Sequence, residues 1–109
     1  MTFTTTTFTT TTTRPEAVIQ RSSEDIVWGV NMDAQLDGDQ TATSPVTVLR
    51  SGRGTEVPLE DAPTAEGMMV RQRIRAGVLT PGTFWLYVRH TPSGTTNVLE
   101  SVLKIVCPR

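Results

Sequence analysis

The chain has 109 residues, which is near the common size of one domain and long enough to bury one hydrophobic core. Ten basic and eleven acidic residues give a net charge of −1, so the charge balance gives no reason to expect nucleic acid or an anionic membrane as a partner. The single cysteine, Cys107, excludes an intramolecular disulfide. We also expect no membrane span and no signal peptide, because no apolar run is long enough.

The chain begins with a threonine-rich segment. Residues 1–13 are almost entirely threonine, broken by Phe3 and Phe8. Threonine favours extended backbone, but the segment has little to bury and should not fold alone. We therefore divide the chain into an extended arm, residues 1–15, and a β-sandwich domain, residues 16–109. The sheet edge of a neighbouring subunit would order the arm through backbone hydrogen bonds, with a phenylalanine in an apolar notch.

Alternating apolar and polar residues predict short strands from Ala17 onward. The first clear strand has four apolar residues on one face, namely Ile26, Trp28, Val30 and Met32. A turn is predicted at residues 36–39 and a second strand at residues 45–49. A short extended piece near Val57 then leads into residues 60–67, which are predicted to form a polar loop that contains a proline.

The second half of the chain predicts three more strands. In residues 68–75, one face carries Met68, Val70, Gln72 and Ile74, and the other carries Met69, Arg71, Arg73 and Arg75. In residues 83–90, one face carries Phe84, Leu86 and Val88, and the other carries Trp85, Tyr87 and Arg89. A last strand is predicted near residues 99–105, after a Pro-Ser-Gly turn. We expect these three strands to form a meander.

Regular turns between short strands, without sustained helical periodicity, predict an all-β fold. About seven strands at this spacing are typical of an immunoglobulin-like antiparallel β-sandwich, here with an extended N-terminal arm. We predict a core that includes Trp28, Val70, Phe84, Leu86, Leu103 and Ile105. The pattern leaves the strand order open, most of all in residues 51–67.

Two parts of the chain resemble a family of phage proteins. Residues 25–39 read Asp-Ile-Val-Trp-Gly-Val-Asn-Met-Asp-Ala-Gln-Leu-Asp-Gly-Asp. They resemble the opening strand and turn of small tailed-phage virion proteins of the fibre-tail adaptor group. The order and spacing of further segments are similar to that group, namely residues 69–74, Gly77, residues 81–83 and residues 91–106. Strands and turns of this kind also occur in immunoglobulin-like domains that decorate phage capsids.

The resemblance implies a non-enzymatic structural protein of a tailed-phage virion, made in the host cytoplasm and located in the particle. The expected partners are other virion proteins, such as major capsid, neck or tail subunits, and copies of the chain itself. The arm would grip neighbouring subunits, and no cofactor is expected. Capsid decoration, as a cement protein, and fibre-tail adaptor both stay open. A carbohydrate-binding or adhesion module is the alternative.

Two groups of residues are candidates for partner binding besides Phe3 and Phe8. Arg71 and Arg73 lie with Arg75 on one strand face, where they could form a basic stripe for phosphate or for an acidic protein surface, or an ordinary solvated face. Trp85 and Tyr87 lie opposite the predicted core face, and could contact another subunit, stack on a glycan or be covered by another segment.

Residues suited to catalysis or metal binding are sparse. The only histidine, His90, is predicted to be exposed and dispensable, and no matched acid and base suggest an enzyme. One cysteine and one histidine are too few for a zinc site. Asp33, Asp37 and Asp39 could hold calcium but are better explained as turn residues. Cys107 is predicted to be a small apolar residue at a strand end that forms no disulfide.

Overall fold

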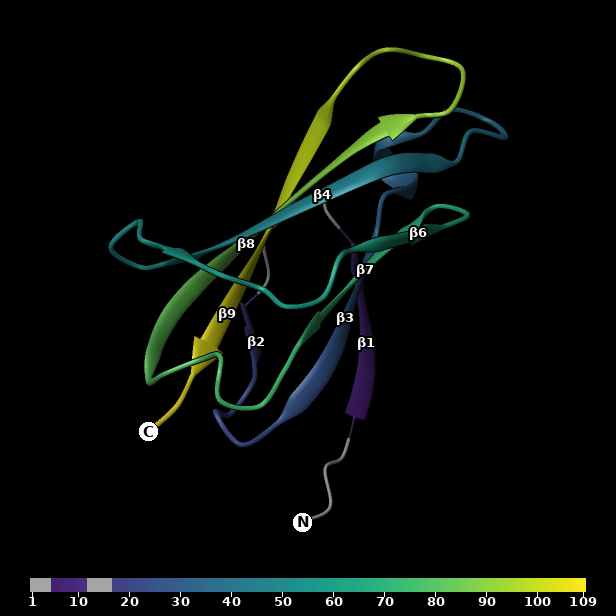
Figure 1. Ribbon diagram of the computed structural model, residues 1–109. Helices are drawn as coiled ribbons and strands as arrows, with labels where there is room; N and C mark the ends of the chain where they lie inside the picture. The colour runs from purple at the N-terminus through teal and green to yellow at the C-terminus, as the bar shows by residue number, and fades with distance from the viewer. Residues whose placement is uncertain (1–4, 12–16) are drawn as a thin grey trace.

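The architecture consists of two β-sheets, seen in a computed structural model that describes residues 5–11 and 17–109 (Figure 1). One sheet has the strand order β1 (Thr5–Thr11), β3 (Asp25–Asn31), β7 (Met69–Ile74) and β6 (Thr64–Glu66). The other has the order β2 (Ala17–Ile19), β9 (Leu99–Cys107), β8 (Gly82–Pro92), β4 (Ala42–Ser51) and β5 (Glu56–Val57). A single 3-10 turn, η1 (Asp33–Gln35), is the helical element of these residues. No helix among them is long and apolar enough to cross a membrane.

The connections between the sheets follow the immunoglobulin-like pattern. The chain passes from β3 to β4 in the other sheet, returns between β5 and β6, and crosses again between β7 and β8. Neighbouring strands are antiparallel, with parallel pairing only of β1 with β3 and of β2 with β9 among the described strands. The predicted all-β sandwich is confirmed.

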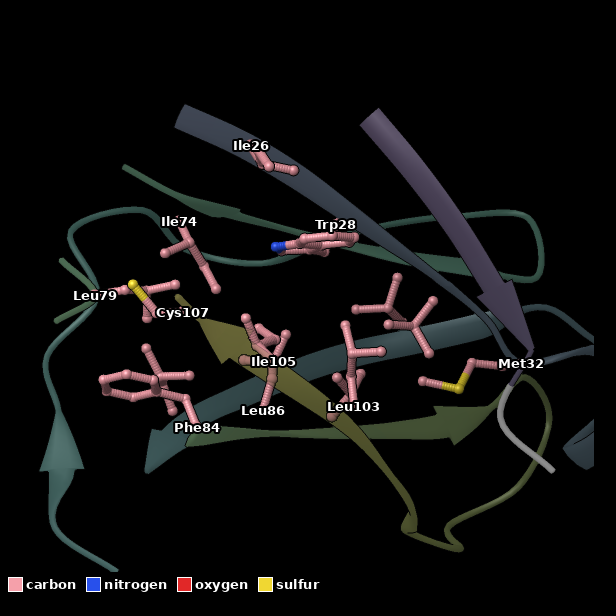
Figure 2. Packing of buried hydrophobic residues seen from close by; sticks show 14 of the residues in the cluster. Ile26, Trp28, Met32, Ile74, Leu79, Phe84, Leu86, Leu103, Ile105 and Cys107 are labelled. Atoms are coloured by element: carbon pink, nitrogen blue, oxygen red, sulfur yellow. The ribbon is translucent and has the colours of Figure 1, made fainter. Parts of the chain in front are cut away.

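The core forms where the inward faces of the two sheets meet (Figure 2). Alternate residues of each strand point inward, because successive side chains of an extended strand lie on opposite faces. The six residues predicted for the core are at most 5% exposed, namely Trp28, Val70, Phe84, Leu86, Leu103 and Ile105. This part of the prediction is confirmed.

Two buried glutamines connect the sheets. Gln20, just after β2, accepts a hydrogen bond from Trp28 Nε1 at 2.7 Å and donates from Nε2 to a carbonyl oxygen of β7 at 2.9 Å. Gln72 of β7 accepts a hydrogen bond from Thr47 Oγ1 of β4 and donates to the carbonyl oxygen of Asp61 at 2.9 Å. Their amides are therefore satisfied in the apolar interior, where unpaired polar groups are costly.

The loop predicted for residues 60–67 contains a strand. β6 pairs with β7 through three residue pairs, and Gly67, at φ 60°, turns the chain between them. Backbone hydrogen bonds are enough to form an edge strand this short, and its side chains need not alternate between apolar and polar. The sequence therefore gave little indication of β6. Met68, predicted to share a strand face with Val70, lies instead in this turn before β7 and is 44% exposed.

The predicted meander of three strands was also wrong. β8 and β9 form an antiparallel hairpin, but β7 pairs with β3 in the other sheet. The connection from β7 to β8 instead crosses the end of the sandwich, where Leu79 is buried in the core. A turn in the sequence does not indicate whether the next strand stays in the same sheet.

The threonine-rich segment contributes a strand to its own domain. β1 runs parallel to β3 from Thr5, opposite Asp25, to Thr11, opposite Asn31 (Figure 1). We expected this kind of pairing with the sheet edge of a neighbouring subunit. Without β1, the chain's own β3 would be an edge strand with unpaired backbone groups, as the sheet edge of a neighbour would be. β1 pairs with these groups of β3.

Candidate functional site

The most distinctive surface is the outer side of the five-stranded sheet, and Trp85 and Tyr87 of β8 lie on it. In β8 the residues that alternate with them, Phe84, Leu86 and Val88, are buried in the core. The two aromatic side chains therefore point outward, and both are half-buried. The predicted faces of this strand are confirmed.

Three rows of residues cross this side of the sheet, because β9, β8 and β4 are in register. The first row is Lys104, Trp85 and Arg50; the middle row is Val102, Tyr87 and Val48; the third row is Glu100, Arg89 and Val46. We call these nine residues the outer sheet face. Its middle row is apolar except for the tyrosine hydroxyl, and its charged residues lie in the outer rows.

Several apolar side chains on this side of the sheet are open to solvent. Val46 is 50% exposed, and Ile19 of β2, farther along the same side, is 60% exposed. Val48 and Val102 are half-buried by their neighbours on the sheet. An apolar surface that runs across several strands of a small domain is typical of a contact with a partner.

The charged side chains of the outer sheet face make contacts along the sheet. Lys104 Nζ lies 5.5 Å from the centroid of the Trp85 ring, a cation–π distance. Arg89 Nε donates to Glu100 Oε2 at 2.6 Å, and both side chains are partly exposed. Exposed pairs of this kind hold their partners weakly and can exchange them at an interface.

The arginines of β7, and Arg75 directly after it, do not form a free basic stripe. Arg73 binds Asp25 with two hydrogen bonds of 2.7 and 2.8 Å, and Arg75 binds Asp61 with two of 2.8 and 3.0 Å. Arg71 pairs with a glutamate of β6 at 2.9 Å. The Arg73 guanidinium holds the pKa of Asp25 below its usual value, and Arg75 does the same for Asp61. Each arginine predicted to bind a partner thus has a carboxylate within the chain.

His90 is not exposed as predicted: it is 0% exposed, at the core side of β8. Its Nε2 lies 2.9 Å from Gln35 Oε1. The Gln35 amide donates to Ser101 Oγ at 3.0 Å, so its oxygen is the acceptor for a neutral His90. Burial lowers the pKa of His90. The alternation of Phe84, Leu86 and Val88 continues to residue 90 and could have predicted this position.

The other candidates for chemistry lie apart. Asp33, Asp37 and Asp39 are exposed. Within residues 17–109, no three His, Cys, Asp or Glu side chains are grouped to hold a metal ion. Cys107 is 2% exposed at the end of β9, which confirms its prediction as a small apolar residue.

A groove of about 390 Å³ runs along the edge of the five-stranded sheet, between β4, β5 and residues 58–63. Its lining includes Glu56, Glu60 and Asp61. Two of these carboxylates already face Arg75, at 3.6 and 2.8 Å. The groove contains neither the histidine nor the cysteine of the chain, which are buried elsewhere.

The two phenylalanines of the N-terminal segment were also candidates. Phe3 lies outside the described residues. The backbone of Phe8 lies in β1, opposite Trp28 of β3. Of the predicted partner-binding residues, the structure therefore brings together Trp85 and Tyr87, and it adds the valines beside them that the sequence did not indicate.

Comparisons with known proteins give no family for the chain: no protein-family model, curated protein or solved structure matches it.

Proposed function

We propose that the chain is a non-enzymatic structural protein of a tailed-phage particle, in which the sandwich docks through the outer sheet face on other subunits of the particle, either other virion proteins or copies of itself. The observation that carries the docking role is this surface, on which Trp85 and Tyr87 lie with two half-buried valines and the exposed Val46. The particle itself is proposed from the resemblance of residues 25–39 and 69–74 to phage adaptor proteins.

A binding role is favoured over catalysis by the places of the reactive groups. General acid–base and nucleophilic catalysis need side chains that reach a substrate. His90 and Cys107 are 0% and 2% exposed. Asp25 and Asp61 are held by arginines. The outer sheet face, in contrast, is accessible and suited to a protein surface.

The N-terminal segment suits a second contact with the particle. Pairing of β1 with β3 uses backbone groups, and the β3 edge of another copy offers the same groups. Exchange of β1 between neighbouring subunits would link them without a new recognition surface. In this role the N-terminal segment would bind a neighbouring subunit through the same strand, β1, that pairs with β3 within the domain.

Localisation of a tagged full-length chain in particles from infected cells tests the proposal. We expect the label on the particle. A signal over the whole capsid indicates decoration, and a signal at the vertex or tail indicates an adaptor. Absence of the chain from purified particles would contradict a virion role.

The docking surface is tested by two matched substitutions. Val46→Lys places a charge on the outer sheet face, and Met68→Lys places the same charge on the turn before β7, at exposed fractions of 50% and 44%. We expect Val46→Lys to reduce attachment to particles at least tenfold, because a charge is buried without a partner. Met68→Lys should attach normally. Equal attachment of both variants would contradict docking through this face.

A carbohydrate-binding module is the second candidate, since Trp85 and Tyr87 lie side by side on one open face, as in a stacking platform. Titration of the isolated chain with a glycan panel tests it, with Trp85→Ala as the control variant. Binding that depends on Trp85 would favour this function over the virion role.

A further inference from the structure

The outer sheet face has its complementary groups on opposite sides of the middle row. On β9, Lys104 and Glu100 lie in the first and third rows. On β8, Trp85 and Arg89 lie in the same two rows. β9 and β8 thus each carry a group and its complement at equal distances from the middle row: an ammonium and a carboxylate on β9, an indole ring and a guanidinium on β8. The third strand, β4, carries Arg50 and Val46 in these two rows.

We propose that the partner of this face is a second copy of the chain, in a symmetric dimer whose two-fold axis runs along the middle row, perpendicular to the strands. A rotation about this axis keeps each strand opposite the same strand of the other copy and exchanges the first and third rows. Lys104 then faces Glu100 of the second copy, and Arg89 faces Trp85 of the second copy. Both contacts occur twice, as a two-fold interface requires.

Charge selects this orientation. A two-fold axis parallel to the strands would keep the rows and exchange β9 with β4 across β8, which places Lys104 opposite Arg50 of the other copy. Two cations opposed in this way repel, and like-charge contacts of this kind are strongly unfavourable. The perpendicular axis gives Lys104 an ion pair and Trp85 a cation–π contact. It also places Arg50 opposite the uncharged Val46 of the other copy.

The middle row supplies the apolar centre of the interface. Tyr87, Val48 and Val102 each lie near the axis and meet the same residue of the second copy. Tyrosine is enriched in the buried centre of interfaces, with charged residues at the rim. The strands of two facing sheets cross at about 30°, which moves residues away from the axis out of direct opposition. The long side chains of lysine, arginine and glutamate can still reach their partners across this offset.

This inference rests on the proposed docking role and names its partner, and the two can fail separately. A chain that is monomeric yet attaches to particles through the outer sheet face would refute the dimer alone. A dimer that is absent from particles would refute the virion role alone.

Sedimentation velocity of the full chain over a range of concentrations tests the dimer. We expect the wild-type chain to dimerise with a Kd below about 1 mM. Lys104→Glu and Glu100→Lys should each raise this Kd about tenfold, because each creates two like-charge contacts in its own dimer. Arg53→Glu makes the same change of charge as Lys104→Glu, but in the exposed turn between β4 and β5, and should leave the Kd unchanged.

An equimolar mixture of Lys104→Glu and Glu100→Lys gives the decisive measurement. In a mixed dimer, the two glutamates of one copy face the two lysines of the other, so both contacts become attractive again. We expect a heterodimer at least as stable as the wild-type dimer, and thermal melting of each variant shows that it is folded. A damaged fold in either variant cannot produce this rescue.

Three outcomes would overturn the proposal: a wild-type chain with no dimer below about 1 mM, single variants that dimerise like the wild type, or a mixture without heterodimers. A dimer that disappears when residues 2–13 are deleted, while the charge variants leave it intact, would instead assign the contact to exchange of β1.

Discussion

His90 is the residue through which pH acts most directly on folding. It is the chain's only histidine, and burial lowers its pKa below the ordinary value of 6.5. Below about pH 6.5 the unfolded chain therefore binds the proton more readily than the folded one. The contribution of a neutral His90 to the free energy of unfolding is complete above this pH and is lost as the pH falls toward the folded pKa. We expect melting temperatures to decrease from about pH 7 to pH 5.5.

A His90→Gln variant is the control for this effect. Glutamine can keep a hydrogen bond to Gln35 but does not titrate, so the melting temperature should be nearly constant over the same pH range. A slope as steep as that of the wild type would show that another group is responsible.

Phe84 tests the inward face of β8 at the level of a single side chain. It is 5% exposed and belongs to the core cluster (Figure 2). We expect Phe84→Ala to lower the free energy of unfolding by about 3–5 kcal/mol, measured by chemical denaturation, because a cavity replaces the ring. Val46→Ala, on the outer sheet face, should change it by less than about 0.5 kcal/mol. A loss under about 1 kcal/mol for Phe84→Ala would place the ring at the surface.

Among the described strands, β1 is an edge strand that pairs with β3 alone, as β2, β5 and β6 each pair with one neighbour. The core side chains that the structure describes all lie between Ile26 and Cys107. We expect deletion of residues 2–13 to leave a folded sandwich, since it removes none of these core side chains. The deletion should also promote self-association, because it exposes the backbone groups of the β3 edge.

Circular dichroism and light scattering of the truncated chain measure the two effects. A truncated chain that is unfolded at room temperature would contradict the expectation that the sandwich folds without β1. A truncated chain that is folded and associates no further than the full chain at high concentration would contradict the exposed edge.

The whole molecule has one continuous core shared by both sheets, so its unfolding should be cooperative. Trp28 is 2% exposed and bonds to Gln20, which follows a strand of the other sheet. In a Trp85→Phe variant, Trp28 is the only tryptophan and reports on the packing of the sheets. We expect its fluorescence and the far-ultraviolet circular dichroism to change at the same denaturant concentration. Separate midpoints would indicate that the sheets come apart before they unfold.

The sequence by itself determined the all-β class, the sandwich and the inward faces of β3, β8 and β9. These are local properties, since alternation along a strand divides its side chains between two faces wherever the strand is placed. The same alternation assigned Trp85 and Tyr87 to the side away from the core. Had the pattern been followed to residue 90, it would have placed His90 correctly as well.

Only the tertiary structure decided which strands pair and which surface stays free. β6, and the pairing of β7 with β3, depend on backbone hydrogen bonds, which every residue except proline can donate and which leave no mark in the side-chain pattern. Arg73 is neutralised by Asp25, which lies 48 residues away in the sequence, so a stripe of arginines that looks free in the sequence is paired in the fold. Likewise, the outer sheet face exists because β9, β8 and β4 lie side by side in register. Its ion pair joins Arg89 of β8 to Glu100 of β9, which this register brings together.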